Sequence, residues 1–425
     1  MLNRILAPAF KQVKNIEFLP AKNFTLDNGI HLHVVDAGDQ DLVRVEFIFN
    51  NVNWNPSKPL QAYTVNSMLT DGTSELTATQ IADKIDYYGA FLQTDYTYDH
   101  SSVTLYSLTK HLKVTLPVIK AIITDSIFPQ DELDTFIRNQ KQSLTVNLEK
   151  NDFLSRKTFS NVLFGDSLYG FNTTAETYDK LTQKQLVEYF KNAYQLSNCT
   201  IVVSGKVTSE TIKILNDLFG NDPVPISTTI ENMFSFPSNS IGSEHYTEKP
   251  EALQSAIRIG RKTINRKHPD FPGLQVLNTV LGGYFGSRLM ANIREDKGYT
   301  YGIGSAIVSL KNAGYFFIAS EVGAEVCSKA IDEINKEVLI LKTQPVPDDE
   351  LVLVRNYMLG SLLGSLENAF SHADKFKNIF FYGLGYDYYE RYIHTVKTIS
   401  AEQIMQLANR YFNTEDFEKV IVGRK

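Results

Sequence analysis

The amino-acid sequence predicts an α+β protein built from two similar domains, each a mostly antiparallel sheet covered by helices. The chain has 425 residues, more than a single hydrophobic core usually holds, so two domains are expected. Hydrophobic residues at 43% and charged residues at 21% are typical of a globular protein with a packed core.

Strand and helix patterns alternate along the first part of the chain. Residues 30–35 and 43–49 have the apolar alternation of strands. Thr77 and Gln80 then have the spacing of a capping box, and apolar residues recur at helical intervals until Gly89. This mixture predicts helices packed on a sheet.

Two separated motifs recur at one offset. A Pro-x-Asp/Glu-rich helix start at Pro129 returns at Pro347, and 347 − 129 = 218. A Thr-x-x-Gln start at Thr182 returns as Ser-x-x-Gln at Ser400, again 400 − 182 = 218. The shared offset indicates duplication of a whole domain, because the unit is far longer than a solenoid repeat.

The composition between the copies predicts the domain boundaries. Residues 223–250 are rich in proline and serine, as exposed linkers are. We therefore expect an N-terminal domain over residues 1–222 and a C-terminal domain over residues 251–425.

The charge balance argues against nucleic acid and membrane surfaces as partners. The formal net charge is −6, from 42 basic and 48 acidic side chains. Residues 1–24 contain no apolar stretch like that of a signal peptide, and no run reaches the 18 or so apolar residues of a membrane span. The expected location is the cytoplasm, without membrane attachment.

Residues 62–73, Ala-Tyr-Thr-Val-Asn-Ser-Met-Leu-Thr-Asp-Gly-Thr, carry the first family resemblance. They resemble the zinc-binding helix of the pitrilysin/insulinase peptidases, where His-x-x-Glu-His precedes an apolar pair and Gly-Thr. Counting back from Gly-Thr, Tyr63 and Ser67 stand at the two histidine positions and Asn66 at the catalytic glutamate. The resemblance implies the fold of pitrilysin and mitochondrial processing peptidase.

These substitutions predict that the chain binds no zinc. Phenol, amide and hydroxyl groups are not usual zinc ligands, and no general base remains to activate water. The family's third ligand is a glutamate on a later helix, and residues 135–148 contain no carboxylate. The sequence therefore predicts no metal and no cofactor in this chain.

Residues 281–301 carry a second resemblance, to the family's glycine-rich turn and its Arg-Glu-x-x-Gly-x-x-Tyr signature. The resemblance implies that Arg294 and Tyr301 hold the substrate carbonyl and stabilise the oxyanion. Considered without that signature, Arg294 would be interpreted as a surface ion-pair partner and Tyr301 as a core residue.

Two further segments have a functional and an ordinary interpretation. Gly282 and Gly283 form either a substrate-contacting loop or a plain turn. Phe91, Leu92 and Gln93 correspond to the family's edge strand that pairs with extended substrate, or to an ordinary core strand.

One histidine pair offers a metal-site alternative. His31 and His33 lie two residues apart in a predicted strand and share a face, but no third ligand accompanies them. We expect no metal there.

Together these features predict the non-zinc subunit of a heterodimeric peptidase. Arg294 and Tyr301 would act on peptide at a zinc site carried by a zinc-motif paralogue. The alternative is a catalytically inactive peptide-binding or scaffold subunit, and self-association into a homodimer is a further possibility. In either case the chain is expected to be inactive alone.

Overall fold

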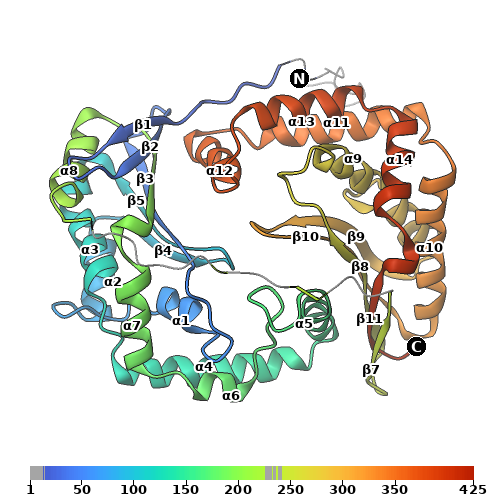
Figure 1. The fold of residues 1–425 in the computed structure, drawn as a ribbon, viewed down its shortest axis with the longest axis horizontal. Coiled ribbons are helices and arrows are strands. Elements are labelled where there is room, and N and C mark those ends of the chain that lie inside the picture. The colour runs from blue at the N-terminus through green and yellow to red at the C-terminus, as the bar shows by residue number, and fades with distance from the viewer. Residues whose placement is uncertain (1–12, 14, 225–231, 233–235, 238–241) are drawn as a thin grey trace, which may run out of the picture.

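Two sheets organise the chain in the computed structural model, one in each half (Figure 1). The structure describes residue 13 and residues 15–224, 232, 236–237 and 242–425. Most of the first 14 residues and much of the expected linker therefore lie outside the described residues. Within the described part, every helix is too short or too polar to cross a bilayer.

The first sheet has the strand order β1-β2-β6-β3-β5-β4, and the second has the order β7-β11-β8-β10-β9. Pairing is antiparallel except between β2 and β6 and between β11 and β7, which confirms the predicted mostly antiparallel sheets. The strands are β1 (Lys22–Thr25), β2 (His31–Asp36), β3 (Leu42–Asn50), β4 (Phe91–Tyr96), β5 (His100–Leu108), β6 (Cys199–Gly205), β7 (Glu244–Glu248), β8 (Gln254–Thr263), β9 (Thr300–Ser309), β10 (Gly314–Gly323) and β11 (Glu418–Gly423).

Helices follow the strands in a similar order in both halves. In the first half they are α1 (Gln61–Ser67), α2 (Ala78–Asp86), α3 (Leu112–Asp125), α4 (Gln130–Leu148), α5 (Asn151–Phe164), α6 (Ala175–Asp179), α7 (Gln183–Ala193) and α8 (Ser209–Phe219). In the second half they are α9 (Phe271–Gly282), α10 (Cys327–Thr343), α11 (Asp348–Gly364), α12 (Ala369–Phe380), α13 (Asp387–Thr398) and α14 (Ala401–Tyr411).

The repeated motifs begin equivalent helices. Pro129 and Pro347 are the residues that precede α4 and α11. Thr182 and Ser400 cap α7 and α14, and each side chain accepts a hydrogen bond from the backbone N–H of the glutamine three residues later. The capping box predicted at Thr77 is also present, at the start of α2. The duplication read from the sequence is therefore a duplication of structure.

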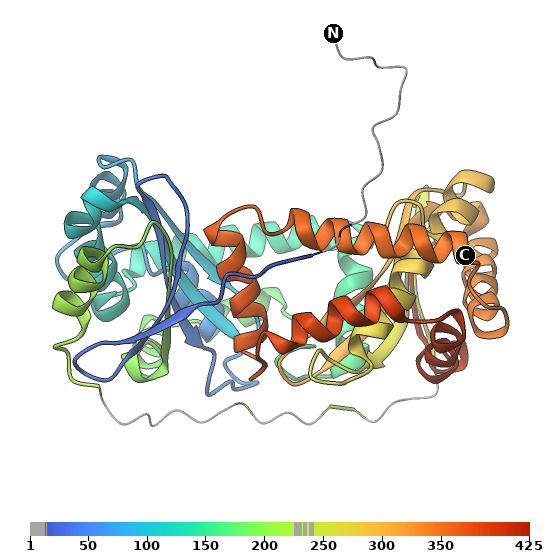
Figure 2. The ribbon, with the colours of Figure 1, turned by 90° about the horizontal axis from the view of Figure 1, so that it is seen from above.

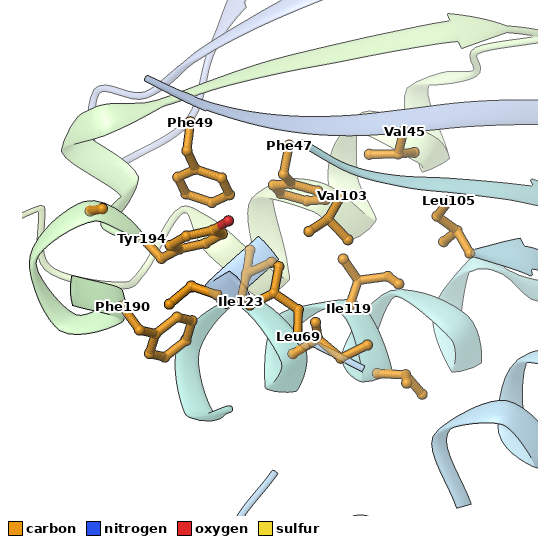
Figure 3. Close-up of a cluster of buried hydrophobic side chains, with 14 of the residues drawn as sticks. Val45, Phe47, Phe49, Leu69, Val103, Leu105, Ile119, Ile123, Phe190 and Tyr194 are labelled. Atoms are coloured by element: carbon orange, nitrogen blue, oxygen red, sulfur yellow. The ribbon is translucent and has the colours of Figure 1, made fainter. Parts of the chain in front are cut away.

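Each half packs its own helices on one face of its sheet. In the first half, alternate residues of β3 and β5 meet apolar side chains from α1, α3 and α7 (Figure 3). Phe47 and Phe49 point into this layer, where Tyr194, the residue after α7, packs on Phe49 with ring centroids 4.5 Å apart. The strand period of two thus leaves the other face of each sheet to be covered separately.

A helix from the opposite half covers that other face. Helix α12 packs on β2 and β6 of the first sheet, and α5 packs on β8 and β11 of the second. The two helices are equivalent in the duplication, because α5 begins at residue 151 and α12 at residue 369, again 218 apart. Figures 1 and 2 show the two halves side by side, each reaching toward the other.

At each contact between a sheet and the helix of the opposite half, a buried arginine forms an ion pair. Arg44 of β3 forms an ion pair with Asp374 of α12 (Nη2 to Oδ1, 2.9 Å). Arg258 of β8 forms the corresponding pair with Asp152 of α5 (Nη2 to Oδ1, 3.2 Å). Each contact joins a buried guanidinium to a half-exposed carboxylate and so favours the docked arrangement of the halves, and Arg44 is also paired with Glu46 of its own strand.

Histidines of the first half are also buried at this contact. His33 packs between the rings of Phe376 and Phe380, and its Nδ1 lies 2.8 Å from Oδ1 of Asn23. His100 lies against the ring of Phe381, with centroids 4.1 Å apart. Burial, with a smaller effect of nearby Lys311, lowers the pKa of His100 to about 4.

The buried neutral His100 predicts a loss of stability in acid. Between pH 6.5 and about 4 the unfolded chain binds more protons at this position than the folded chain does. The free energy of unfolding therefore decreases as the pH is lowered, by roughly 2–3 kcal/mol in total. Urea unfolding at several pH values measures this dependence. His100→Phe, which cannot titrate, should reduce the slope in this window, to which His33 and His372 also contribute because burial lowers their pKa. Parallel curves for His100→Phe and the native chain would contradict the assignment.

Candidate functional site

The degenerate zinc motif, formed by Tyr63, Asn66 and Ser67, lies on helix α1. Val65 and Met68 are fully buried in the first core, whereas Tyr63 and Ser67 are only half-buried. Since residues four apart share one helix face, Tyr63 and Ser67 occupy the same face, as two zinc ligands would. Gly72 closes the segment with φ of +153°, a conformation that favours glycine.

Tyr63 contacts the helix that was expected to supply a third ligand. Its phenol O–H donates to Oε1 of Gln140 on α4 over 3.3 Å. Its ring lies against Tyr96 and Phe136, with centroid distances of 5.5 and 6.1 Å. Helix α4 therefore does face the motif, and it presents an amide there.

Asn66 and Ser67 are engaged in internal hydrogen bonds. Asn66 is 1% exposed, and its Oδ1 accepts a hydrogen bond from the phenol of Tyr194 over 2.9 Å. Burial raises the pKa of Tyr194 well above its ordinary value, so this phenol stays protonated and able to donate. The Ser67 hydroxyl donates to the backbone oxygen of Tyr63 over 2.9 Å. These groups do not fit a zinc ion.

No alternative metal cluster replaces the motif. Across the described residues, no group of three or more His, Cys, Asp and Glu side chains is arranged to hold an ion. His31 and His33, the pair considered for a metal, lie at contacts with β1: Nδ1 of His31 is 3.3 Å from the Thr25 hydroxyl, and His33 pairs with Asn23.

Strand β4 lies at the edge of the first sheet, next to α1. It pairs with β5 on one side, and it is the last strand in the sheet order. Phe91 is 57% exposed, Leu92 is half-buried and Gln93 is exposed, with its amide donating to Asp95. The segment is thus an edge strand rather than a central one, and pairing with a peptide stays a prediction.

A pocket of about 540 Å³ opens between the end of β4, the N-terminal end of α1 and the segment after α5. It is lined mostly by aromatic and apolar side chains: Trp54, Pro59, Leu60, Tyr63, Tyr96, Thr97, Tyr98, Leu168, Phe171, Thr173 and Tyr178. Burial raises the pKa of Tyr178 to about 12 and also raises that of Tyr96 and Tyr98, so these phenols are neutral at physiological pH.

Arg294 lies in a π-helical segment, Met290–Asp296, of the second half. Its guanidinium carbon is 4.7 Å from the ring centroid of the exposed Phe285, and Nη1 is 3.8 Å from Oε1 of Glu295. A π-helical turn inserts an extra residue and is frequent at functional sites. The local fold thus holds Arg294 at the surface in a defined position.

Tyr301 is 93% exposed, near the start of the edge strand β9. The β9–β10 register shifts beside it, so that Tyr301 and Gly302 lie opposite the single residue Glu321. Such a bulge re-aims a side chain out of the sheet pattern. The Thr300 hydroxyl fixes the bulge by donating to the backbone oxygen of Glu321 over 2.6 Å.

Gly282 and Gly283 lie where α9 meets β9. A Cβ on Gly282 would lie 2.6 Å from Oγ of Ser305, and one on Gly283 would lie 2.7 Å from Cα of Thr279. Close packing therefore requires glycine at both positions, whatever else these residues do, and the substrate contact stays a prediction.

The two motifs lie in different halves of the chain. Figure 1 shows α1 in the first half and β9 in the second, and Arg294 makes its contacts within its own half.

Several known proteins are similar to this chain in sequence or in structure. The family model described as "Peptidase M16 inactive domain" matches residues 180–358. The "Uncharacterized zinc protease YmxG" of Bacillus subtilis is 26% identical, over 85% of this chain and 88% of that protein. The "Non-peptidase homolog YmxG" of Helicobacter pylori is 23% identical, over 84% and 83%. A crystal structure of a peptidase M16 inactive domain from Pseudomonas fluorescens superposes with a TM-score of 0.85 at 21% identity, covering 95% of this chain and 98% of that one.

The chain is therefore similar in sequence and fold to the M16, pitrilysin-like peptidases. It resembles the inactive type of these proteins, because its own motif positions carry Tyr63, Asn66 and Ser67 in place of the catalytic set. This result confirms the family resemblance and the fold that it implied.

The site brings together several residues that the sequence alone did not predict. Gln140 lies on the helix expected to carry the third ligand, but its amide is not a usual zinc ligand and gave no signal of a contact with Tyr63. Tyr194, the partner of Asn66, lies 128 residues away and carried no local signal. The aromatic residues Tyr96 and Tyr98 are visible in the sequence, but their convergence with Trp54 depends on the fold.

The Tyr63–Gln140 contact predicts where a zinc site could be built in this chain. Tyr63→His with Ser67→His places two imidazoles on one face of α1, and Gln140→Glu adds a carboxylate facing them. We expect the triple variant to bind Zn²⁺ at least about tenfold more tightly than the double variant, by calorimetric titration.

The control for this experiment is Gln142→Glu, an exposed position on the same helix, in the same double-histidine background. Equal zinc affinity with the carboxylate at 140 or at 142 would show that Gln140 does not occupy the ligand position.

Proposed function

We propose that this chain is the non-zinc subunit of a two-chain peptidase, supplying Arg294 and Tyr301 to a site whose zinc lies on a partner chain. The observation that carries the proposal is the 93% exposed phenol of Tyr301, aimed outward by a bulge, in a family member whose own motif groups are engaged internally. A partner of matching architecture, a zinc-motif paralogue, is the expected second chain.

The chemistry proposed for the pair is charge stabilisation. The guanidinium of Arg294 and the phenol O–H of Tyr301 are both donors, and an oxyanion forms on the carbonyl oxygen as water attacks a peptide bond. Zinc on the partner would supply the activated water and polarise the same carbonyl. The present chain needs only to present its donors where negative charge develops.

Peptide binding is the second part of the proposal. An extended substrate can add to the free edge of β4, where backbone hydrogen bonds give affinity with little sequence preference. Contact of the peptide with the Gly282–Gly283 segment belongs to the same proposal.

A catalytically inactive, peptide-binding or scaffold subunit is the second candidate. It is favoured by the loss of all motif ligands and by the similarity to the Helicobacter protein named as a non-peptidase homolog. A complex that contains zinc and cleaves peptides supports the first candidate, and a stable complex without metal or cleavage supports the second. Self-association in the absence of a paralogue is compatible with either candidate.

Loss of the Tyr301 hydroxyl should slow cleavage by the two-chain complex. We expect Tyr301→Phe to lower kcat by about 100-fold or more, the usual effect of removing one oxyanion donor. The measurement is cleavage of a fluorogenic peptide by the chain mixed with a zinc-motif paralogue from the same organism.

Tyr87→Phe is the matched control, because Tyr87 is 83% exposed and lies on the first half, after α2. Its kcat should equal that of the native complex. Full activity of Tyr301→Phe in the assembled complex would remove the catalytic part of the proposal.

A further inference from the structure

The pocket beside the degenerate motif has an unusual lining. Six of its residues are aromatic, namely Trp54, Tyr63, Tyr96, Tyr98, Phe171 and Tyr178, and none of its described lining residues is charged. Trp54 and Phe171 face each other edge to face across 6.4 Å, and Tyr63 meets Tyr96 in the same way. Its volume of about 540 Å³ lies within the range of ligand sites.

The residues that line the pocket determine which chemical groups it can bind. A charged group would lose its hydration here without gaining an ionic partner, which is costly in an apolar site. Flat apolar groups instead gain edge-to-face contacts with the surrounding rings. The pocket therefore fits a neutral aromatic group.

The position of the pocket indicates how the backbone of a bound peptide would run. Tyr96, the last residue of β4, is part of the lining, and the strand continues into Thr97 and Tyr98. Leu92, Thr94 and Tyr96 are the less exposed set of β4, so they face the helices of the first half. A strand added to β4 would direct alternate side chains to the same side, so one at the level of Tyr96 would point into the pocket.

We propose that this pocket binds a neutral aromatic side chain of an extended peptide whose backbone continues along the edge of β4. Tyr63 supplies part of the wall at the position where the family resemblance places a zinc ligand. The inference deepens the peptide-binding part of the proposed function, and it requires neither Arg294 nor Tyr301.

The single tryptophan of the chain reports on the pocket. Because Trp54 is the only tryptophan, selective excitation observes the lining directly. The experiment titrates the full chain, without a partner, with a blocked threonine-rich heptapeptide that carries one central phenylalanine. We expect a saturable change in Trp54 emission, and at least about tenfold weaker binding when aspartate replaces the phenylalanine, since burial of one aromatic side chain contributes at least this factor.

Two variants test the lining. Phe171→Ala removes one wall, and Thr173→Phe adds a ring to the lining; each should weaken heptapeptide binding about tenfold or more. Tyr87→Ala, which removes an exposed aromatic ring outside the pocket, should leave binding unchanged. Circular dichroism establishes that each variant is folded, and Thr173→Phe decides the matter should Phe171→Ala unfold.

Three outcomes would overturn the inference. The first is the absence of a saturable signal, and the second is equal affinity for the phenylalanine and aspartate peptides. The third is equal affinity for N-acetylphenylalaninamide and the heptapeptide, which would mean that the pocket takes a small aromatic compound and that β4 contributes nothing. Since no partner chain is present, failure here leaves the result of the Tyr301→Phe experiment unaffected.

Discussion

The exchange of α5 and α12 between the halves is the constraint on which the rest of the structure depends. Each sheet has its own helices on one face, and its other apolar face is completed by the opposite half. An uncovered sheet face of this kind would expose a contiguous apolar surface. The exchange therefore fixes how the halves lie, and in Figure 1 strands β4 and β10 both extend toward the middle of the molecule. The ion pairs of Arg44 and Arg258 with the opposite half favour this arrangement.

The motif helix is held in place by the first half's own core. Val65 of α1 and Met68, which directly follows the helix, are buried in that core, so packing and not a metal sets the position of α1. Each replaced group then acquired an internal partner: Gln140 for Tyr63, Tyr194 for Asn66, and a backbone oxygen for Ser67. A buried polar group without a partner would cost roughly 1–3 kcal/mol, so these pairings preserve the frame without zinc.

Features that depend on residues close together in the chain could be predicted from the sequence. Contacts between distant segments could not. The helix starts at Thr182 and Ser400 could be read from the sequence because a cap and its partner lie three residues apart. The motif positions on α1 were equally local. The docking of α12 on the first sheet, by contrast, joins residues more than 300 positions apart, such as Arg44 and Asp374. The aromatic pocket was missed for the same reason, since its walls come from segments separated by more than 100 residues.

The two halves of the chain carry surfaces of different chemistry. In the second half, a π-helical turn holds the half-buried Arg294 and a bulge holds the exposed Tyr301, whose phenol stabilises the fold only slightly. In the first half, the surface around α1 is aromatic and internally hydrogen-bonded. Exposed donors gain energy only from a group that approaches from outside, whereas an uncharged pocket gains energy only from an apolar group. Under the proposed function, one chain presents two surfaces of different chemistry to a polypeptide: the first would take its side chains, and the second its carbonyl oxygens.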